Sequence, residues 1–105
     1  MARRWYLACY DIAEPKRLRR THHLLCDWGF PVNYSVFLVE ARRDEIDRLV
    51  TQLERLIDDA FDDIRIYALP RHAEILAIGW KRPAVFDGAG YVERLLADPV
   101  RAIYT

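Results

Sequence analysis

The chain is poor in the residues that hold small disulfide-rich or zinc-bearing domains together. Its 105 residues include two cysteines, four glycines and five prolines, and so few cysteines favour a protein of the reducing cytoplasm over a secreted disulfide scaffold. The adjacent His22 and His23 have no cysteine or acid at the spacing of a zinc site. No apolar run approaches the ~18 residues of a membrane span, and no glycine-rich phosphate loop occurs. We therefore expect a cytoplasmic globular domain without a membrane partner.

Charge is balanced overall but is unevenly distributed along the chain. The formal net charge is zero, so the total gives no indication of a nucleic-acid partner. Residues 1–20, however, contain six basic and two acidic residues, whereas residues 44–63 contain eight acidic and two basic ones. This asymmetry predicts one basic and one acidic face. Arginine outnumbers lysine 14 to 2, which suits two-point phosphate contacts, although a G+C-rich genome produces the same bias.

Hydrophobic periodicity and punctuating residues predict two helices among several strands. Pro15 suits the first turn of a helix and Gly29 its C-terminal end, and the residues of 43–57 place one apolar face opposite a charged one. The residues of 30–40 are β-branched and aromatic, with either a tight turn or a kink at 33–35. The predicted strands are 4–10, 30–40, 64–69 and 74–80, the predicted helices are 15–28 and 43–57, and a short helix is expected at 91–97.

This order of elements predicts a fold of the α/β (α+β) class. Two helices dispersed among four or five strands suggest a ferredoxin-like βαββαβ sandwich, in which both helices cover one face of an antiparallel sheet. An extra C-terminal strand would follow. We expect one domain over residues 1–80 and a tail over residues 81–105 that docks a second subunit or a partner. Because a chain of this size buries only a modest core, a homodimer is the expected assembly.

Asp11 ends the first predicted strand, whose other residues are mostly apolar or aromatic. A carboxylate at a strand end suits a metal-binding or catalytic role, but Asp is also a common turn residue that caps a following helix. One carboxylate alone makes a poor Mg²⁺ site. A symmetric dimer would supply a second copy of Asp11 across its axis, so both interpretations stay open.

Four basic residues occupy the first turns of the helix that follows: Lys16, Arg17, Arg19 and Arg20. Cations at a helix N-terminus oppose the helix dipole, at a cost of ~0.3–1 kcal/mol each at low salt. This local cost is consistent with phosphate binding. A solvated face paired with Glu14 and Asp27 explains the same residues equally well, so the residues alone do not decide between the two.

The ordered set of motifs resembles one known family. The segments YDI (10–12), PKRLRR (15–20), VNYSVF (32–37) and IRIYAL (64–69) look, in this order and spacing, like the small CRISPR-associated adaptation protein of the "Cas two" family. The resemblance covers residues 5–80. The family often has glutamate directly after the phenylalanine of the third segment, whereas this chain has Leu38 there and Glu40 two positions further on.

The resemblance implies a ferredoxin-like homodimer that bridges the "Cas one" integrase and binds duplex DNA during spacer acquisition. It also implies a metal-dependent endonuclease acting on DNA or single-stranded RNA, in which Asp11 of both subunits holds Mg²⁺ or Mn²⁺ and serves catalysis. The residues expected to contact nucleic acid are Tyr10, Lys16, Arg17, Arg19, Arg20, Ser35 and Phe37. From the residues alone, Tyr10 and Phe37 are better core candidates than base-stacking ones.

Two further functions fit the same pattern. A stand-alone, toxin-like ribonuclease of the same fold would need no integrase, and a small regulatory ferredoxin-like domain would need no chemistry at all. Sensitivity to Asp11→Ala separates a metal-dependent nuclease from a DNA-binding scaffold, because only the nuclease requires the carboxylate.

Overall fold

Two helices are interspersed among six strands in the described part of the chain. The structure, a computed structural model, describes residues 2–33, 35–72, 74–77 and 101–104. In chain order, its elements are β1 (Arg4–Asp11), α1 (Pro15–Trp28), β2 (Gly29–Asn33), β3 (Val36–Ala41), α2 (Arg43–Leu56), β4 (Asp63–Ala68), β5 (Glu74–Ala77) and β6 (Arg101–Tyr104). The predicted α+β class is confirmed, and most predicted boundaries agree within one or two residues.

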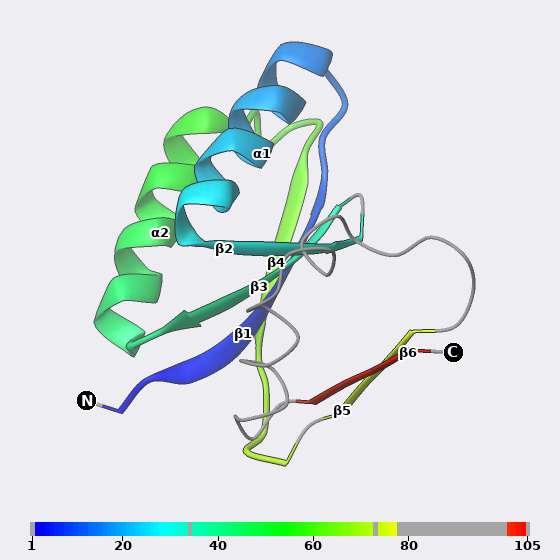
Figure 1. Cartoon of the computed structure of the whole chain (residues 1–105). Helices are drawn as coiled ribbons and strands as arrows, with labels where there is room; N and C mark the ends of the chain where they lie inside the picture. Colours follow the sequence, from blue (N-terminus) through cyan, green and yellow to red (C-terminus); the bar gives the residue numbers. More distant parts are fainter. Residues whose placement is uncertain (1, 34, 73, 78–100, 105) are drawn as a thin grey trace.

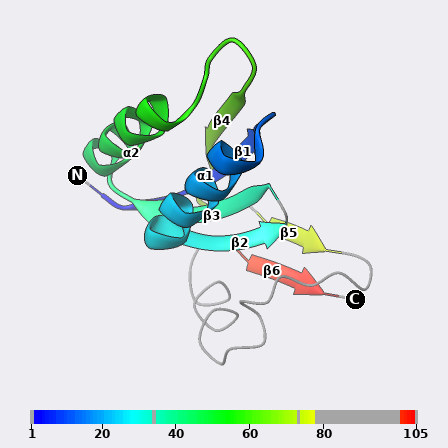
Figure 2. The ribbon, with the colours of Figure 1, turned by 90° about the horizontal axis from the view of Figure 1, so that it is seen from above.

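The first four strands form one antiparallel sheet in the order β2-β3-β1-β4. β1 lies in the interior and pairs with both β3 and β4, so Asp11 at its end lies opposite Asp63 at the start of β4. Both helices lie on one face of this sheet (Figures 1 and 2). Sheet and helices thus form two layers, and the segment after β1 connects the sheet layer to the helix layer.

The segment 29–41 is a hairpin rather than one kinked strand. β2 ends at Asn33, β3 begins at Val36, and the register shifts between Pro31 and Asn33. β2 is an edge strand of the sheet, and an edge position is where a strand tolerates the missing N–H of proline. The turn predicted at 33–35 is therefore the correct alternative.

The C-terminal strands pair with each other. β5 and β6 form a separate two-stranded parallel sheet in which Glu74 lies opposite Arg101. The expected extra C-terminal strand is thus present as β6, but within the described residues it joins β5 and not the four-stranded sheet. The helix predicted at 91–97 falls outside the described residues.

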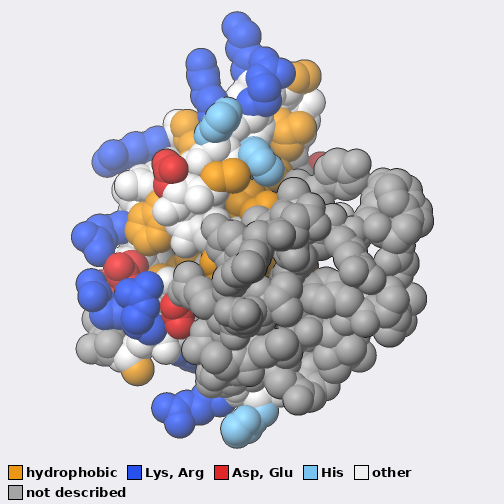
Figure 3. All heavy atoms as spheres, in the orientation of Figure 1, with side chains coloured by type: hydrophobic (Ala, Val, Ile, Leu, Met, Phe, Trp, Pro, Cys, Tyr) orange, Lys and Arg blue, Asp and Glu red, His pale blue; other side chains and the backbone are white. Residues whose placement is uncertain are grey.

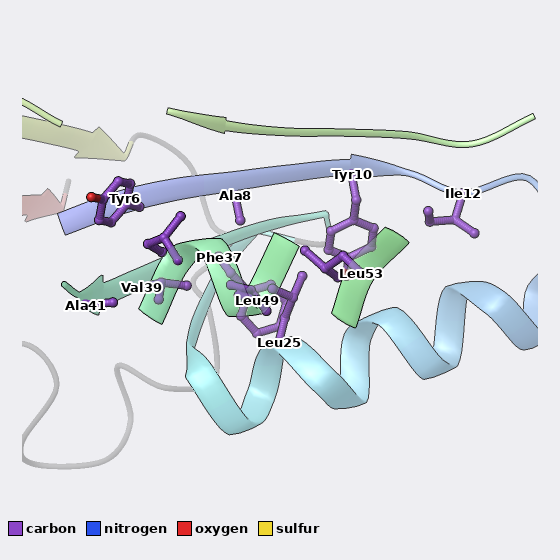
Figure 4. Close-up of a cluster of buried hydrophobic side chains, with 11 residues drawn as sticks. Tyr6, Ala8, Tyr10, Ile12, Leu25, Phe37, Val39, Ala41, Leu49 and Leu53 are labelled. Atoms are coloured by element: carbon purple, nitrogen blue, oxygen red, sulfur yellow. The ribbon is translucent and has the colours of Figure 1, made fainter. Parts of the chain in front are cut away.

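Side chains from the sheet and both helices build the core (Figure 4). Along β1, alternate residues point toward the helices, and along β3 Phe37 and Val39 do the same with no exposed surface. Leu25 of α1 and Leu49 of α2 are also fully buried. The buried members of this cluster are Tyr6, Ala8, Tyr10, Ile12, Leu25, Phe37, Val39, Ala41, Ile46, Leu49 and Leu53.

The face of the sheet opposite the helices also carries buried aromatic side chains. Trp5 and Phe30 are 4% and 6% exposed, and their ring centroids lie 5.7 Å apart. Side chains alternate along a strand, so Asp11 belongs to this second face, whereas its neighbour Tyr10 points into the core. Within the described residues neither helix has the length and apolarity that crossing a bilayer would require.

Candidate nucleic-acid interface

Three cations lie exposed at the N-terminal end of α1: Lys16, Arg19 and Arg20, here called the basic cluster. None forms a side-chain hydrogen bond or ion pair with another residue that the structure describes. Figure 3 shows Lys and Arg side chains gathered over this end of the helix. Three exposed cations in the first turns of a helix can neutralise backbone phosphates without distinguishing base sequence.

Glu14 offsets the cost of placing cations at this helix start. Its carboxylate accepts hydrogen bonds from the backbone N–H groups of Lys16 (2.6 Å) and Arg17 (3.1 Å), so Glu14 caps the helix. These backbone bonds, the one from Lys16 foremost, lower the pKa of Glu14. The helix cap is therefore Glu14, and the alternative role of Asp11 as the capping acid is wrong.

Arg17 differs from its three basic neighbours because its charge is already compensated. Its Nε lies 2.7 Å from Asp62 Oδ2, and its second terminal nitrogen lies 3.2 Å from Asp62 Oδ1. The guanidinium also lies 3.9 Å from Glu14 Oε1. A phosphate would have to compete with two carboxylates for Arg17. The expected pairing with Glu14 is present, but the second partner is Asp62 and not Asp27.

Asp62 is the buried carboxylate of this region, with no exposed side-chain surface. Besides the two bonds from Arg17, it accepts hydrogen bonds from the backbone N–H groups of Ala13 (3.0 Å) and Asp58 (2.9 Å). These four donors come from the β1–α1 loop, from α1 and from the α2–β4 loop. The hydrogen bond from Arg17 is the main reason that the pKa of Asp62 lies far below its usual value.

Asp11 is exposed and lies at the same end of the molecule as the basic cluster. Asp63, its register partner on β4, is also exposed, and residues directly opposite on antiparallel strands have Cβ atoms about 4.5–5.5 Å apart. Asp63 Oδ2 accepts a hydrogen bond from Arg65 Nε at 3.1 Å. No group of three or more His, Cys, Asp or Glu side chains suited to a metal occurs among the described residues.

This donor set has too few protein ligands for a closed metal centre, and its chemistry is that of a divalent-cation site completed by other ligands. Mg²⁺ prefers oxygen ligands and is commonly bound by one or two carboxylates together with water and substrate phosphate. Asp11 and Asp63 provide two such carboxylates on adjacent strand ends. The carboxylates of Asp11 and Asp63 are thus of the ligand type that Mg²⁺ or Mn²⁺ takes, although Asp63 is also paired with Arg65.

Tyr10 and Phe37 pack together in the core, and Ser35 contacts Tyr10 through its backbone. Tyr10 N–H donates to the Ser35 carbonyl at 3.0 Å, and the rings of Tyr10 and Phe37 lie 6.2 Å apart. The Tyr10 hydroxyl lies 3.2 Å from Nδ1 of His22, whose ring packs edge-to-face with Phe37 at a centroid distance of 5.3 Å. Burial raises the pKa of Tyr10.

Burial decides what these three residues can do. Phe37 has no exposed surface and Tyr10 is 5% exposed, so neither ring has a free face for a base to stack on. Their expected interpretation as core aromatics is confirmed. Ser35 is half-buried in the hairpin turn. Leu38, where the family often has glutamate, is fully buried and occupies a position where a carboxylate would need a buried partner.

Two acids of this region were not predicted from the sequence. Asp62 and Asp63 stand in the segment DDAFDD, which the periodicity marks only as the end of a helix. Their partners Arg17 and Asp11 lie 45 and 52 positions away along the chain. Nothing in the neighbouring sequence therefore indicates these pairings. The only sign of a functional segment is a loop in which four acids surround Phe61, which is 72% exposed.

Comparison with protein families supports the resemblance seen in the motifs. The family model described as CRISPR associated protein Cas2 matches residues 4–74. A "CRISPR-associated endoribonuclease Cas2 1" of Nitrosomonas europaea is 36% identical over 83 residues, which are 79% of this chain and 77% of that protein. A "CRISPR-associated endonuclease Cas2 2" of Thermus thermophilus is 35% identical over 81 residues, covering 75% of this chain and 88% of that protein.

Solved structures agree with the sequence comparison. The crystal structure of Streptococcus pyogenes Cas2 is similar with a TM-score of 0.60 at 34% identity, covering 63% of this chain and 86% of that one. The match therefore spans most of the solved chain.

Proposed function

This chain belongs to the CRISPR-associated protein Cas2 family, and on that premise we propose that it serves CRISPR spacer acquisition as a homodimer that binds duplex DNA and the Cas one integrase. The observation that carries this proposal is the basic cluster, because its three cations are exposed and none forms a side-chain hydrogen bond or ion pair with a described residue. The strand order β2-β3-β1-β4, with both helices on one face, supports the ferredoxin-like arrangement of this family.

The basic cluster supplies the nucleic-acid contacts in this proposal. Lys16, Arg19 and Arg20 bind backbone phosphates, which fixes the position of the duplex without reading its sequence. Tyr10 and Phe37 contribute indirectly, because their side chains pack in the core between α1 and strands β1 and β3. Binding is therefore expected to weaken steeply with salt and to be similar for unrelated sequences.

Asp11 is the residue proposed to hold a divalent cation, Mg²⁺ or Mn²⁺. A two-fold axis near the end of β1 would add the Asp11 of a second subunit, and Asp63 lies opposite within the same chain. When bound, such an ion activates water and stabilises charge on the phosphate. Asp11 and Asp63 would hold such an ion, and the basic cluster would hold the phosphodiester.

A stand-alone ribonuclease is the second candidate function. The observation that favours it is the name of the Nitrosomonas europaea relative, an endoribonuclease. Such an enzyme would act on single-stranded RNA, whose phosphates the basic cluster can bind equally well, and would need no integrase.

The first experiment compares the wild-type protein with Asp11→Ala in a reconstituted mixture of integrase and short duplex DNA. We expect both proteins to bind the integrase and the duplex, because Asp11 is exposed and outside the basic cluster. Integration by both proteins would assign a scaffold role, whereas integration by the wild type alone would make the carboxylate necessary for acquisition. Failure of the wild type to bind the integrase would refute the adaptation role.

A parallel assay addresses cleavage directly. Single-stranded RNA and duplex DNA are incubated with each protein in Mg²⁺, in Mn²⁺ and in excess chelator. A metal-dependent nuclease would cleave only with the ion and only with Asp11 present. Arg19→Gln serves as the control, since it keeps Asp11 and removes one phosphate contact, so its loss of activity should be reversed by more substrate.

A further inference from the structure

The ion pair between Arg17 and Asp62 joins the two parts of the proposed site. Asp62 reaches across to Ala13, two residues after Asp11, and to Arg17 in the first turns of α1. The residue after Asp62, Asp63, begins β4 opposite Asp11. One buried carboxylate therefore fixes the loop between the acidic and basic parts of the site.

A buried carboxylate at this position requires all of its partners. Its two oxygens share four donors: Nε and a terminal nitrogen of Arg17, and the backbone N–H groups of Ala13 and Asp58. Removing a charge from water is costly unless hydrogen bonds and an opposite charge compensate for it. The two-point geometry also requires arginine, because the ammonium group of lysine cannot present two parallel N–H donors.

Exposure separates Arg17 from the basic cluster. The Arg17 side chain is 22% exposed, and its fork is directed at Asp62. Lys16, Arg19 and Arg20 are exposed and have no such partner within the described residues. A cation that is already neutralised within the protein releases few counterions when nucleic acid binds.

We propose that Arg17 and Asp62 act as positioning residues, which hold the β1–α1 loop so that Asp11 and the basic cluster keep a fixed mutual arrangement, and that Arg17 is not itself a phosphate ligand. This inference rests on the proposed function, since it assumes that the basic cluster binds nucleic acid. It assigns to Asp62 a role that neither its charge nor its burial would suggest for a nucleic-acid-binding protein.

The variant Asp62→Asn distinguishes a positioning role from direct phosphate binding by Arg17, because the two predict opposite changes in DNA affinity. Its affinity for a fluorescent duplex DNA is measured by anisotropy at several salt concentrations, beside the wild type. If Asp62 positions the site, affinity falls about threefold or more, a size typical of indirect coupling between contacting residues. If Arg17 is a direct phosphate ligand, the loss of a competing negative charge strengthens binding and overturns the proposal. Unchanged affinity with reduced stability would show a purely structural role and would also overturn it.

A matched pair of lysine variants keeps the test decisive if Asp62→Asn does not fold. Arg17→Lys retains the charge but loses the two-point contact, so it should weaken binding about as much as Asp62→Asn. Arg48→Lys makes the same substitution at an exposed site on α2, outside the basic cluster, and should bind like the wild type. Equal binding by both lysine variants would overturn the proposal.

The same measurements separate this inference from the proposed function. Arg19→Gln should reduce the slope of log affinity against log salt by about 0.9 for duplex DNA. If the wild type does not bind, or if Arg19→Gln leaves the slope unchanged, the proposed function fails and the positioning role fails with it. If the slope changes as expected while Arg17→Lys binds normally, only the positioning role is refuted.

Discussion

Replacing Gly29 with alanine tests how closely the C-terminal end of α1 is joined to the sheet. Gly29 caps α1 and begins β2. A Cβ atom at this position would overlap the carbonyl oxygen of Leu38 and would lie 2.9 Å from its carbonyl carbon and 3.0 Å from Val39 Cγ2. Two of these three atoms belong to the backbone of β3, so no side-chain rotation can relieve the contact.

The close approach of Gly29 to β3 determines the sign of the stability change on substitution. The backbone of Gly29 is extended, with φ −164° and ψ −154°, a conformation that alanine also adopts. Without the contact, the substitution would stabilise the protein by about 0.4–1 kcal/mol through the unfolded state. With it, β2 and β3 must separate, and we expect a net loss of about 1–3 kcal/mol, as for other overpacked sites.

Urea unfolding followed by far-UV circular dichroism measures this difference. Arg48→Ala, on the exposed face of α2, serves as the control and should change stability by no more than about 0.5 kcal/mol. Gly29 lies at the end of α1 away from Lys16, so the salt dependence of nucleic-acid binding should stay that of the wild type. A urea midpoint at or above the wild-type value for Gly29→Ala would refute the reasoning.

Two further predictions concern the core and the buried carboxylate. Leu49→Ala removes a side chain with no exposed surface and should cost about 2–5 kcal/mol in urea unfolding; a loss as small as that of Arg48→Ala would contradict the observed packing. The pKa of Asp62 in the folded protein lies below its ordinary value of 3.8, so its contribution to stability is complete above that pH and is lost as the pH falls toward the folded value. Urea midpoints measured from pH 6 to pH 2 should therefore fall less steeply for Asp62→Asn than for the wild type, and parallel curves would show that Asp62 does not carry this dependence.

Local sequence signals are sufficient for most of the secondary structure. Pro15 and Gly29 mark both ends of α1, and the spacing of apolar residues identifies α2 almost to its last turn. The hairpin between β2 and β3 is less certain from sequence, because one continuous apolar strand and two shorter ones share the same composition. The turn forms only because each of the two shorter segments pairs with its own neighbouring strands, and this pairing is set by the tertiary structure.

Strand pairing near the C-terminus is likewise not predictable from local sequence. The segment 74–80 reads as a strand from its apolar residues, and β5 lies within it. Its partner β6 lies 27 positions further along the chain and joins it in parallel. Neither the partner nor the direction follows from local composition, since apolar strands can pair with any free edge.

The candidate site likewise has features that local sequence predicts and features that only the tertiary structure shows. Sequence alone determined the strand that ends at Asp11, the basic first turns of α1 and the family resemblance, because each of these depends on neighbouring residues. Only the tertiary structure separated Arg17 from Arg19 and Arg20, since Asp62, the residue that neutralises it, is 45 positions away. The physical reason is that helix and strand propensities act over a few residues, whereas the compensation of charge depends on groups that only the folded chain brings within hydrogen-bonding distance.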